Sequence, residues 1–451
     1  MTKLVNTAIM APHPAPAAAE PDVGAPASTA CPPQQVRWHH GAFRYVLRGV
    51  LHLYEFLMAV ARRIGPRPRT LNNGRGDVLL TGSFYSENWI TAHLRPIAAS
   101  RSCRRVWIVS TFPIPPTPKV VAIYPPDWLR RMLGDVPARL LTFIWTGLRR
   151  RPHVVGGFHL LVNGLLASLL ARTVGARSLY FCVGGPMEML DGGIWAENRV
   201  FGRLKQPDAA IEQQLVRTVG NFDAVVTMGT GAVRFFHQRG VPGRYHVVSG
   251  GIDTTRFHPG GTDPTYDLIL VGRLAPVKRI DLFLRTVQRV ANAYPGVRAA
   301  IVGDGEERAA LENLAQRLDI TGNVAFLGHQ RDTGTWLRRA RVFMLTSRSE
   351  GLALSLMEAM ACGLPAIVTD VGDLADLVDH GANGYLIREH SPEALADPIV
   401  ELLTDESKRA AFAQAALRSA ARYAPAAVAG RWDTILHDVV TQTEPETHYD
   451  L

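Results

Sequence analysis

Short apolar segments alternate with helical segments along most of this chain, and the alternation runs twice. The first run begins with DVLLTGS at residues 77–83 and continues through RVWIVST, HVVGGFH, RSLYFCVGG and FDAVVTMG. Strands that alternate with helices predict a parallel sheet, because each strand needs a long crossover before the chain can return in the same direction. The unbroken apolar strands indicate a sheet that is covered on both faces.

The second run begins with YDLILVGRL at residues 266–274 and continues through VRAAIVGDG, VAFLGH, RVFMLTS and PAIVTD. Residues 249–265, rich in Gly, Thr, Asp and Pro, have the composition of a connection between the runs. We therefore predict an α/β protein of two Rossmann-like, doubly wound domains, residues 65–248 and 249–424. Ligands bind at the carboxyl ends of the strands in such sheets, so the two edges should face each other across a cleft.

The first 64 residues lie outside this pattern. Residues 1–40 are rich in Pro and Ala and predict disorder, and they lack the ordered features of a signal peptide. Residues 41–64 predict a basic amphipathic helix, interrupted too often by polar residues to span a bilayer. Such a helix can lie on an anionic membrane surface or pack on its own domain, and its amphipathicity fits both. Six arginines belong to this helix and the residues after it: Arg44, Arg48, Arg62, Arg63, Arg67 and Arg69.

The charge and the cysteine content of the chain limit the kinds of partner, metal site and compartment that it fits. The chain has 49 Lys and Arg against 40 Asp and Glu, and the net charge of +9 favours anionic partners such as phosphates or an anionic membrane. The four cysteines, Cys31, Cys103, Cys182 and Cys362, are widely spaced and form no ligand motif. This spacing argues against zinc and disulfides and favours a reducing cytoplasm.

Two carboxylates in TSRSEGLALSLMEAMACGLPAIVTD, residues 346–370, need partners. Glu358 lies among apolar residues, and a buried charge is destabilising unless it is paired or hydrogen-bonded. Glu350 comes just before a helix that we expect to begin near Leu354. The unpaired N–H groups and the dipole at the start of a helix attract phosphate.

A second motif, LVGRLAPVK, places Arg273 and Lys278 just after a strand, at the edge where the cleft should lie. An Arg fork and a mobile Lys together suit a diphosphate. A nucleotide-sugar would fit every group, with its ribose on Glu358 and its sugar hydroxyls on Glu350. The alternatives are that the cations are solvated loop charges, that Glu350 only complements the helix dipole, and that Glu358 pairs with an arginine.

The segment around the two glutamates resembles the E-x7-E motif of family-four retaining glycosyltransferases, which have the GT-B fold. The resemblance covers residues 247–388 and includes VVSGGIDTTRFHP, LVGRLAPVKRID and GLPAIVTDVGDLADLVDHGANGYLI in the family's order. It implies that Arg273 and Lys278 bind the donor diphosphate. It also implies that Glu358 binds the ribose and that Glu350 contacts the donor sugar.

The resemblance further implies that the backbone at Leu354 and Ser355 approaches the phosphates. The loop after Gly328, which includes Gln330, would cradle the base. GT-B proteins commonly send their last helix back to the N-terminal domain, and residues 425–442 match that crossover helix.

The N-terminal half departs from the family pattern. The family often has a Gly-Gly loop after its first strand, and Gly82 and Ser83 stand in that place. Many members have a His after the strand that matches SLYFCVGGP, whereas here His159 follows the preceding strand. We take His159 as a catalytic candidate, although a lone His is more often structural. Three acidic residues in the GGPMEMLDGGIWAE segment are further cleft candidates: Glu188, Asp191 and Glu197.

These features together predict a retaining glycosyltransferase, with Glu350, Arg273, Lys278 and His159 as catalytic residues. It would move a sugar from a nucleotide-diphosphate sugar to a glycan or lipid-linked acceptor, as in exopolysaccharide or glycolipid assembly. We expect no cofactor and no metal, no nucleic-acid partner, and a cytoplasmic location, peripheral on the cytoplasmic face of a membrane. A non-catalytic sugar-nucleotide-binding subunit, a sugar-nucleotide epimerase and a phosphorylase remain alternatives.

Overall fold

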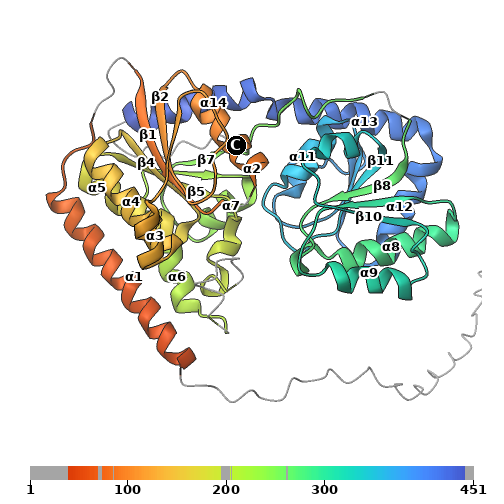
Figure 1. Ribbon diagram of the computed structural model, residues 1–451, viewed down its shortest axis with the longest axis horizontal. Helices are drawn as coiled ribbons and strands as arrows, with labels where there is room; N and C mark the ends of the chain where they lie inside the picture. Colours follow the sequence, from red (N-terminus) through yellow and green to blue (C-terminus); the bar gives the residue numbers. More distant parts are fainter. Residues whose placement is uncertain are drawn as a thin grey trace, which may run out of the picture.

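The computed structural model describes residues 39–69, 74–84, 86–194, 204, 206–260 and 263–441 of the chain. These residues form two α/β domains, each built on a fully parallel sheet (Figure 1). The predicted doubly wound fold class is therefore confirmed. The predicted tail, residues 1–40, lies outside the described residues except for its last two, and the candidate Glu197 lies outside them as well.

The sheet of the N-terminal domain has seven strands in the order β3-β2-β1-β4-β5-β6-β7. The strands are β1 (Gly76–Thr81), β2 (Cys103–Val109), β3 (Val120–Ile123), β4 (Val154–Phe158), β5 (Arg177–Cys182), β6 (Ala224–Thr227) and β7 (Tyr245–Val247). The helices are α2 (Glu87–Ala99), α3 (Asp127–Leu133), α4 (Asp135–Arg150), α5 (Leu165–Val174), α6 (Ala209–Val219) and α7 (Thr230–Gln238), and short helical turns cover Leu160–Gly164, Gly185–Glu188 and Leu190–Gly192.

Alternate residues of these strands point to opposite faces of the sheet, and both faces are buried. Leu79 and Val155 pack with α4 and α5 on one face. Their neighbours Val78 and Val154 pack with α2 and the last helix of the chain on the other face. The apolar strand sequences are the direct result, because neither set of side chains meets water.

The sheet of the C-terminal domain has six strands in the order β10-β9-β8-β11-β12-β13. The strands are β8 (Tyr266–Val271), β9 (Ala299–Val302), β10 (Val324–Gly328), β11 (Ala340–Leu345), β12 (Ala366–Thr369) and β13 (Gly384–Ile387). The helices are α8 (Ile280–Ala293), α9 (Arg308–Arg317), α10 (Thr333–Leu337), α11 (Leu354–Ala361), α12 (Pro392–Thr404) and α13 (Glu406–Ala420), with short turns at Pro276–Lys278, Leu374–Asp376 and Ala421–Tyr423.

The last helix, α14 (Pro425–Thr441), returns from the C-terminal domain and packs on α2 of the N-terminal domain (Figure 1). Trp432 is buried there, with its ring centroid 5.7 Å from that of Phe181. Asp433 accepts a hydrogen bond of 2.6 Å from the Ser100 hydroxyl. This helix fills the sheet face that α2 alone leaves uncovered, so it fastens the two domains together.

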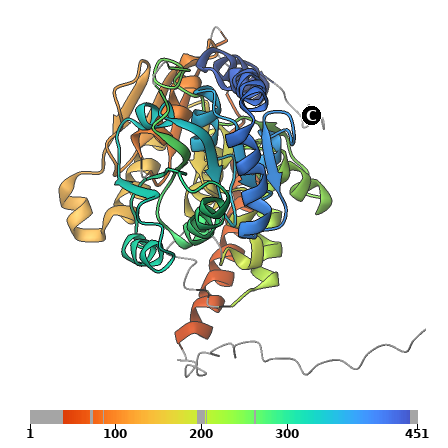
Figure 2. The ribbon, with the colours of Figure 1, turned by 90° about the vertical axis from the view of Figure 1, so that its right-hand side faces the viewer.

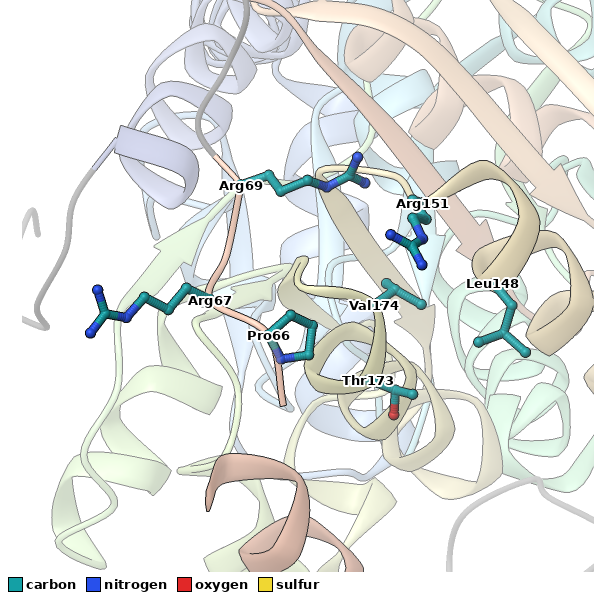
Figure 3. Close-up of a pocket in the computed structure, with 7 residues that line it drawn as sticks. All are labelled: Pro66, Arg67, Arg69, Leu148, Arg151, Thr173 and Val174. Atoms are coloured by element: carbon teal, nitrogen blue, oxygen red, sulfur yellow. The ribbon is translucent and has the colours of Figure 1, made fainter. Parts of the chain in front are cut away.

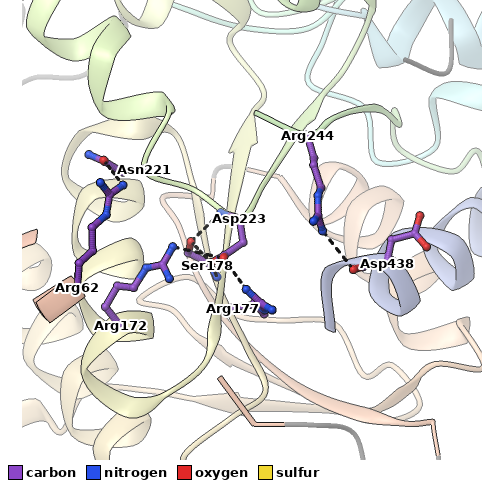
Figure 4. Close-up of polar contacts among 8 residues, drawn as sticks. All are labelled: Arg62, Arg172, Arg177, Ser178, Asn221, Asp223, Arg244 and Asp438. Atoms are coloured by element: carbon purple, nitrogen blue, oxygen red, sulfur yellow. Dashed lines mark hydrogen bonds and ion pairs between the residues drawn. The ribbon is translucent and has the colours of Figure 1, made fainter. Parts of the chain in front are cut away.

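Helix α1 (His39–Ile64) packs on its own domain, against α5 and α6. Arg44 and Arg48 each lie 2.9 Å from the buried carboxylate of Asp208. Arg62 donates a hydrogen bond of 2.6 Å to Asn221 (Figure 4). Arg44, Arg48 and Arg62, which were candidates for binding a membrane, therefore hold the helix to its own domain instead. Among the described residues, no helix is long and apolar enough to cross a bilayer.

Candidate active site

Lys278 and Glu350 are 72 residues apart in the sequence and form an ion pair in the structure. Lys278 ends the helical turn after β8, and its Nζ lies 2.6 Å from Oε1 of Glu350 in the loop after β11. The Glu350 side chain is only 9% exposed and that of Lys278 22%, so neither is a solvated loop charge. Ser347 donates its hydroxyl to the same glutamate oxygen. Strands β8 and β11 are neighbours in the sheet, which is why their two following loops meet.

The loop that carries Glu350 is fixed by a glycine across from it. Gly372, in the loop after β12, has a backbone φ of 59°, which side chains rarely allow. A Cβ on this residue would lie 1.8 Å from the backbone oxygen of Glu350. Only glycine therefore lets the two loops come this close, and their contact holds the carboxylate in place.

Helix α11 begins four residues after Glu350. Its N-cap residue, Ala353, has no side chain that could accept a hydrogen bond from the first turn. The N–H groups of Leu354 and Ser355 lie in this first turn, at the positive end of the helix dipole. The start of α11 therefore presents a positive potential that suits an anion, and the ion pair holds Lys278 beside it, with its charge neutralised by Glu350.

Glu358 lies one turn inside the same helix and is 7% exposed. Burial raises the pKa of its carboxyl group to about 8, against the opposing effect of the positive charge on Arg256. None of the ion pairs among the described residues includes Glu358. Hydroxyl groups of a ligand that enters beside it would favour the ionised form and so lower this pKa.

Arg256 is a site residue that the sequence did not single out. Its guanidinium donates to Asn88 of the N-terminal domain at 2.8 Å and to the backbone oxygen of Arg331 at 2.9 Å. It therefore links the two domains beside Glu358. The only sequence signal was its place in the VVSGGIDTTRFHP motif, and no local pattern shows that this arginine faces a helix 100 residues later.

Three further predicted donor residues lie at the carboxyl edge of the same sheet. Arg273 is exposed in the loop after β8. Gly328 ends β10, with a backbone φ of 67°, and Gln330 follows it. The Gln330 amide turns back to donate to the Leu327 backbone oxygen at 2.7 Å. The edge from β10 to β11 thus gathers the residues that the E-x7-E resemblance assigned to one donor.

On the N-terminal side, Gly82 and Ser83 follow β1 at the carboxyl edge of its sheet. Gly82 is packed so tightly that a Cβ would lie 2.9 Å from the Phe158 side chain. Arg139, from α4, is 3% exposed and donates to the hydroxyls of Ser83 and Thr81 at 3.4 Å each. A buried arginine at this edge is another feature that the sequence did not single out.

His159 and Glu188 form a hydrogen-bonded pair in the N-terminal domain. His159 Nδ1 lies 3.0 Å from Oε1 of Glu188, whose other donors are the N–H groups of Leu160 and Gly184 and the hydroxyl of Tyr180, each at 2.8 Å. Burial alone would raise the pKa of Glu188, but the charge on His159 and these donors lower it below its usual value. The carboxylate is therefore ionised near neutral pH, and it holds Nδ1 as the protonated nitrogen and leaves Nε2 on the far side of the ring.

His159 also has an unusual backbone, with a φ of 65° directly after β4. Such strain concentrates at functional sites, because the surrounding structure must hold it. The other candidate, Asp191, has a φ of 54°, and its N–H donates to Glu212 of α6 at 2.7 Å. This contact lies within the N-terminal domain, as do the contacts of the His159–Glu188 pair, in which His159 directly follows β4.

The two domains meet at this level. Gly351, next to Glu350, lies so close to Val183 that a Cβ would be 2.9 Å from the Val183 backbone oxygen. Val183 begins the loop after β5 that leads to Glu188. A second contact joins the domains where Asp376 accepts hydrogen bonds from the N–H and hydroxyl of Thr230, at the start of α7. The Glu350 loop therefore lies against the loop that leads from β5 to Glu188. Among the described residues, no group of three or more His, Cys, Asp or Glu side chains is arranged to hold a metal.

Solved structures share this two-domain fold. The model superimposes on the Anabaena protein HepE in complex with UDP-glucose with a TM-score of 0.62, at 18% identity over 80% of this chain and 99% of that one. It superimposes on the sucrose-phosphate synthase of Thermosynechococcus elongatus with a TM-score of 0.64, at 18% identity over 80% of this chain and 98% of that one. At these identities the likeness shows the fold alone.

Two curated relatives each match less than half of this chain. The D-inositol 3-phosphate glycosyltransferase 2 of Catenulispora acidiphila is 34% identical over 209 residues, which is 42% of this chain and 49% of that protein. The N-acetyl-alpha-D-glucosaminyl L-malate synthase of Bacillus anthracis is 30% identical over 174 residues, 38% of this chain and 45% of that protein. The chain thus matches about half the length of these relatives. The family model described as glycosyl transferases group 1 matches residues 252–419, which are most of the C-terminal domain.

Proposed function

We propose that this protein is a retaining glycosyltransferase that takes its sugar from a UDP-sugar. The observation that carries the proposal is the edge of the C-terminal domain where Lys278, Glu350 and the start of α11 meet beside buried Glu358. This edge lies inside the region that matches the glycosyl transferases group 1. The choice of uridine as the base is supported by HepE and by the pneumococcal O-GlcNAc transferase, both of which were crystallised with UDP.

The donor would bind with its diphosphate between Arg273, Lys278 and the N–H groups of α11. Lys278 and Glu350 neutralise each other across 2.6 Å. In the complex, Lys278 would turn to the phosphates and Glu350 would accept hydrogen bonds from the sugar hydroxyls. Glu358 would accept the ribose hydroxyls, which explains why a carboxyl group stands at a buried helix position.

Transfer would break the bond between the anomeric carbon and the phosphate oxygen and join that carbon to the acceptor hydroxyl on the same face. The acceptor proton would move to the departing phosphate oxygen, as the family resemblance implies. Negative charge grows on the diphosphate as the bond breaks, so Arg273, Lys278 and the helix start contribute most in the transition state. The cations that bind the diphosphate would therefore supply most of the electrostatic stabilisation of the transition state.

His159 would act from the opposite side of the cleft, where its ring meets the reacting sugar. Glu188 would be a positioning residue, because it touches His159 and not the substrate. The acceptor that we propose is a glycan or a lipid-linked molecule, in exopolysaccharide or glycolipid assembly. The cysteines that the structure describes are buried free thiols, which supports a reducing compartment such as the cytoplasm.

The test is to incubate the purified protein with a panel of nucleotide-sugars and to follow the products by NMR. We expect slow release of UDP from one UDP-sugar without an acceptor, and the α or β configuration of the donor kept in any transfer product. Tight binding without cleavage, across many acceptors, would instead make the protein a binding subunit. Interconversion of the donor sugar would indicate an epimerase, and cleavage that requires free phosphate would indicate a phosphorylase.

A further inference from the structure

Among the residues that the structure describes, the exposed large apolar side chains are confined to two segments of the N-terminal domain. Most globular surfaces scatter such residues singly, and a gathered set marks a contact surface. Within the described part of the chain, all of them lie in α1 or between β3 and the end of α4: Tyr45, Val46, Val50, Leu53, Phe56, Leu57, Val60, Ile64, Val121, Tyr124, Trp128, Met132, Leu133, Val136, Leu141, Trp145 and Leu148.

Helix α1 carries two separate apolar stripes. The buried stripe, Leu47, Leu51, Tyr54 and Met58, packs on the domain. A second stripe runs along the outside at spacings of three and four residues, from Val46 through Leu53 and Leu57 to Ile64, and Ile64 is 77% exposed. The domain needs only the first stripe for its own packing, so the second is left for another partner.

Helices α3 and α4 present a second outward apolar face. Trp128 of α3 is 63% exposed, and Trp145 of α4 is 66% exposed. Leu141, Trp145 and Leu148 follow one another at helical spacing on the outside of α4. Arg139, the single charged residue between Asp135 and Arg149, points inward to Ser83. A soluble surface helix would normally be charged here.

The two helices that carry most of these side chains are joined through a third helix. Both α1 and α4 pack on α5, and α1 extends beyond the rest of the domain (Figure 2). Gly147 lets α4 approach α5 so closely that a Cβ would lie 2.6 Å from the Leu170 side chain. Gly65, after α1, lies equally close to the backbone oxygen of Arg172 at the end of α5. We call the combined outer surface of α1, α3 and α4 the docking face.

The charge excess of the chain is concentrated on the same two segments. Residues 43–69 and 120–151 contain twelve arginines and three acidic residues, an excess of nine positive charges. The whole chain has a net charge of +9, so the remainder is neutral. Some of these arginines bind their own domain, but Arg131, Arg149 and Arg151 are exposed at the ends of α3 and α4.

A cavity of about 220 Å³ joins the ends of α1 and α4. It is lined by Pro66 and Arg67 after α1, by Leu148 and Arg151 at the end of α4, and by Arg69 with the last residues of α5. Figure 3 shows Arg69 and Arg151 extending toward each other across it, while Arg67 turns away. Burial and the charge on Arg151 lower the pKa of Arg69, and the nearby carboxylate of Asp77 offsets only part of this effect.

We propose that the docking face binds the surface of an anionic bilayer, with a lipid headgroup phosphate in the Arg69–Arg151 cavity. Outward tryptophans beside arginines are the composition of interfacial protein surfaces, which insert apolar side chains to the level of the headgroups. A second copy of the chain fits this face poorly, because the same excess of positive charge would meet itself.

Docking would place the cleft beside the membrane. Arg139 lies on α4, the helix that carries Trp145, and it reaches Ser83 at the carboxyl edge of the sheet. A lipid-linked acceptor would then need to rise only past the rim of the domain to reach the His159 side of the cleft. Membrane binding by the docking face does not depend on the proposed donor chemistry, so an experiment can disprove either proposal without affecting the other.

The experiment is co-sedimentation of the full chain with vesicles of neutral phosphatidylcholine, with and without about one third phosphatidylglycerol. We expect binding to the anionic vesicles that weakens as salt is raised. Trp128→Ser with Trp145→Ser should weaken it by about tenfold or more. Arg131→Gln with Arg149→Gln should weaken it by about 25-fold, since each arginine near such a surface contributes about fivefold. Arg151→Gln should weaken vesicle binding by about fivefold.

The matched control is Arg285→Gln with Arg289→Gln on α8, which removes the same charge from an exposed helix of the other domain. This control should bind vesicles like the wild type. All variants change exposed residues, so their thermal unfolding and nucleotide affinity should stay unchanged, which checks that they fold. Equal binding by all variants, no binding to anionic vesicles, or a dimer in solution that the tryptophan variant abolishes would each overturn the proposal.

Discussion

The buried carboxyl group of Glu358 makes the donor affinity depend on pH in a direction that can be worked out. Its pKa is about 8 in the ligand-free protein. Ribose hydroxyls donate best to an ionised carboxylate, so the form that binds should be the deprotonated one. Donor affinity should therefore rise with pH up to about 8 and level off above it.

The magnitude follows from the pKa. At pH 7, a group with a pKa of about 8 is protonated about ten to one, and removing that proton costs about 1.4 kcal/mol. The affinity should thus fall about tenfold for each pH unit below 8. The raised pKa of Glu358 also affects stability. It contributes to the free energy of unfolding fully below pH 4.5, the ordinary pKa of the group, and this contribution is lost as the pH rises toward 8.

The assay is calorimetry with an intact UDP-sugar, whose phosphates do not titrate near neutral pH, in buffers of different ionisation enthalpy. Wild-type protein should release close to one proton on binding at pH 7. Glu358→Gln should release none, show a flat pH profile, and bind more weakly by about 1.5–3 kcal/mol at pH 8, as for a lost hydrogen bond to a charged group. The reasoning is refuted if the wild-type affinity is the same at pH 6 and pH 8, or if the variant keeps the wild-type profile.

Three other outcomes test the rest of the site and the packing of α1. His159→Ala should lower kcat by about 100-fold or more, and Glu188→Gln should lower it less, both with unchanged donor KM; a change in KM alone would make the pair structural. Gly372→Ala should abolish transfer and lower the free energy of unfolding by more than about 1–2 kcal/mol, because the new Cβ would clash with the Glu350 backbone. Wild-type activity and melting temperature in this variant would show that Gly372 does not hold the two loops together. Asp208→Ala should destabilise the domain by about 2 kcal/mol and Asp208→Asn by about half of that, because Asn still caps α6 but lacks the charge that binds α1. Equal denaturation midpoints for the two variants would show that the charge of Asp208 does not stabilise the packing of α1.

The residues of the donor edge could be predicted because each follows an apolar strand or begins a helix. The strand before Arg273 and the helix that contains Glu358 are local patterns, and parallel sheets place their carboxyl ends at one edge. The ion pair between Lys278 and Glu350 is a consequence of that topology. Their mutual contact was not predicted, because the sequence indicates which sheet edge the two residues share but not that they form an ion pair.

Other features depend on contacts between distant segments. Arg256 approaches Glu358 from a connection between the domains, and nothing in its neighbours shows this direction. The helices α3 and α4 were not predicted, because the Pro-rich segment before β3 interrupts the alternation of strands and helices. The sequence of α1 shows an amphipathic helix but cannot tell which of its two apolar stripes is buried, and so left the membrane and the domain as alternatives.

The most direct test of the donor site compares two lysines that form the same kind of ion pair. Lys278 and Lys408 each lie 2.6 Å from a glutamate oxygen, Lys278 at the proposed diphosphate site and Lys408 on α13, where it contacts Glu401. The measurement is kcat for UDP-sugar cleavage in Lys278→Ala and Lys408→Ala, together with affinities for UDP and for uridine. Lys278→Ala should lose about 100- to 1,000-fold in kcat and bind UDP more weakly but uridine normally, while Lys408→Ala should match the wild type in all three. Near-wild-type turnover in Lys278→Ala, or an equal loss in both variants, would contradict the assignment of the donor diphosphate to this edge.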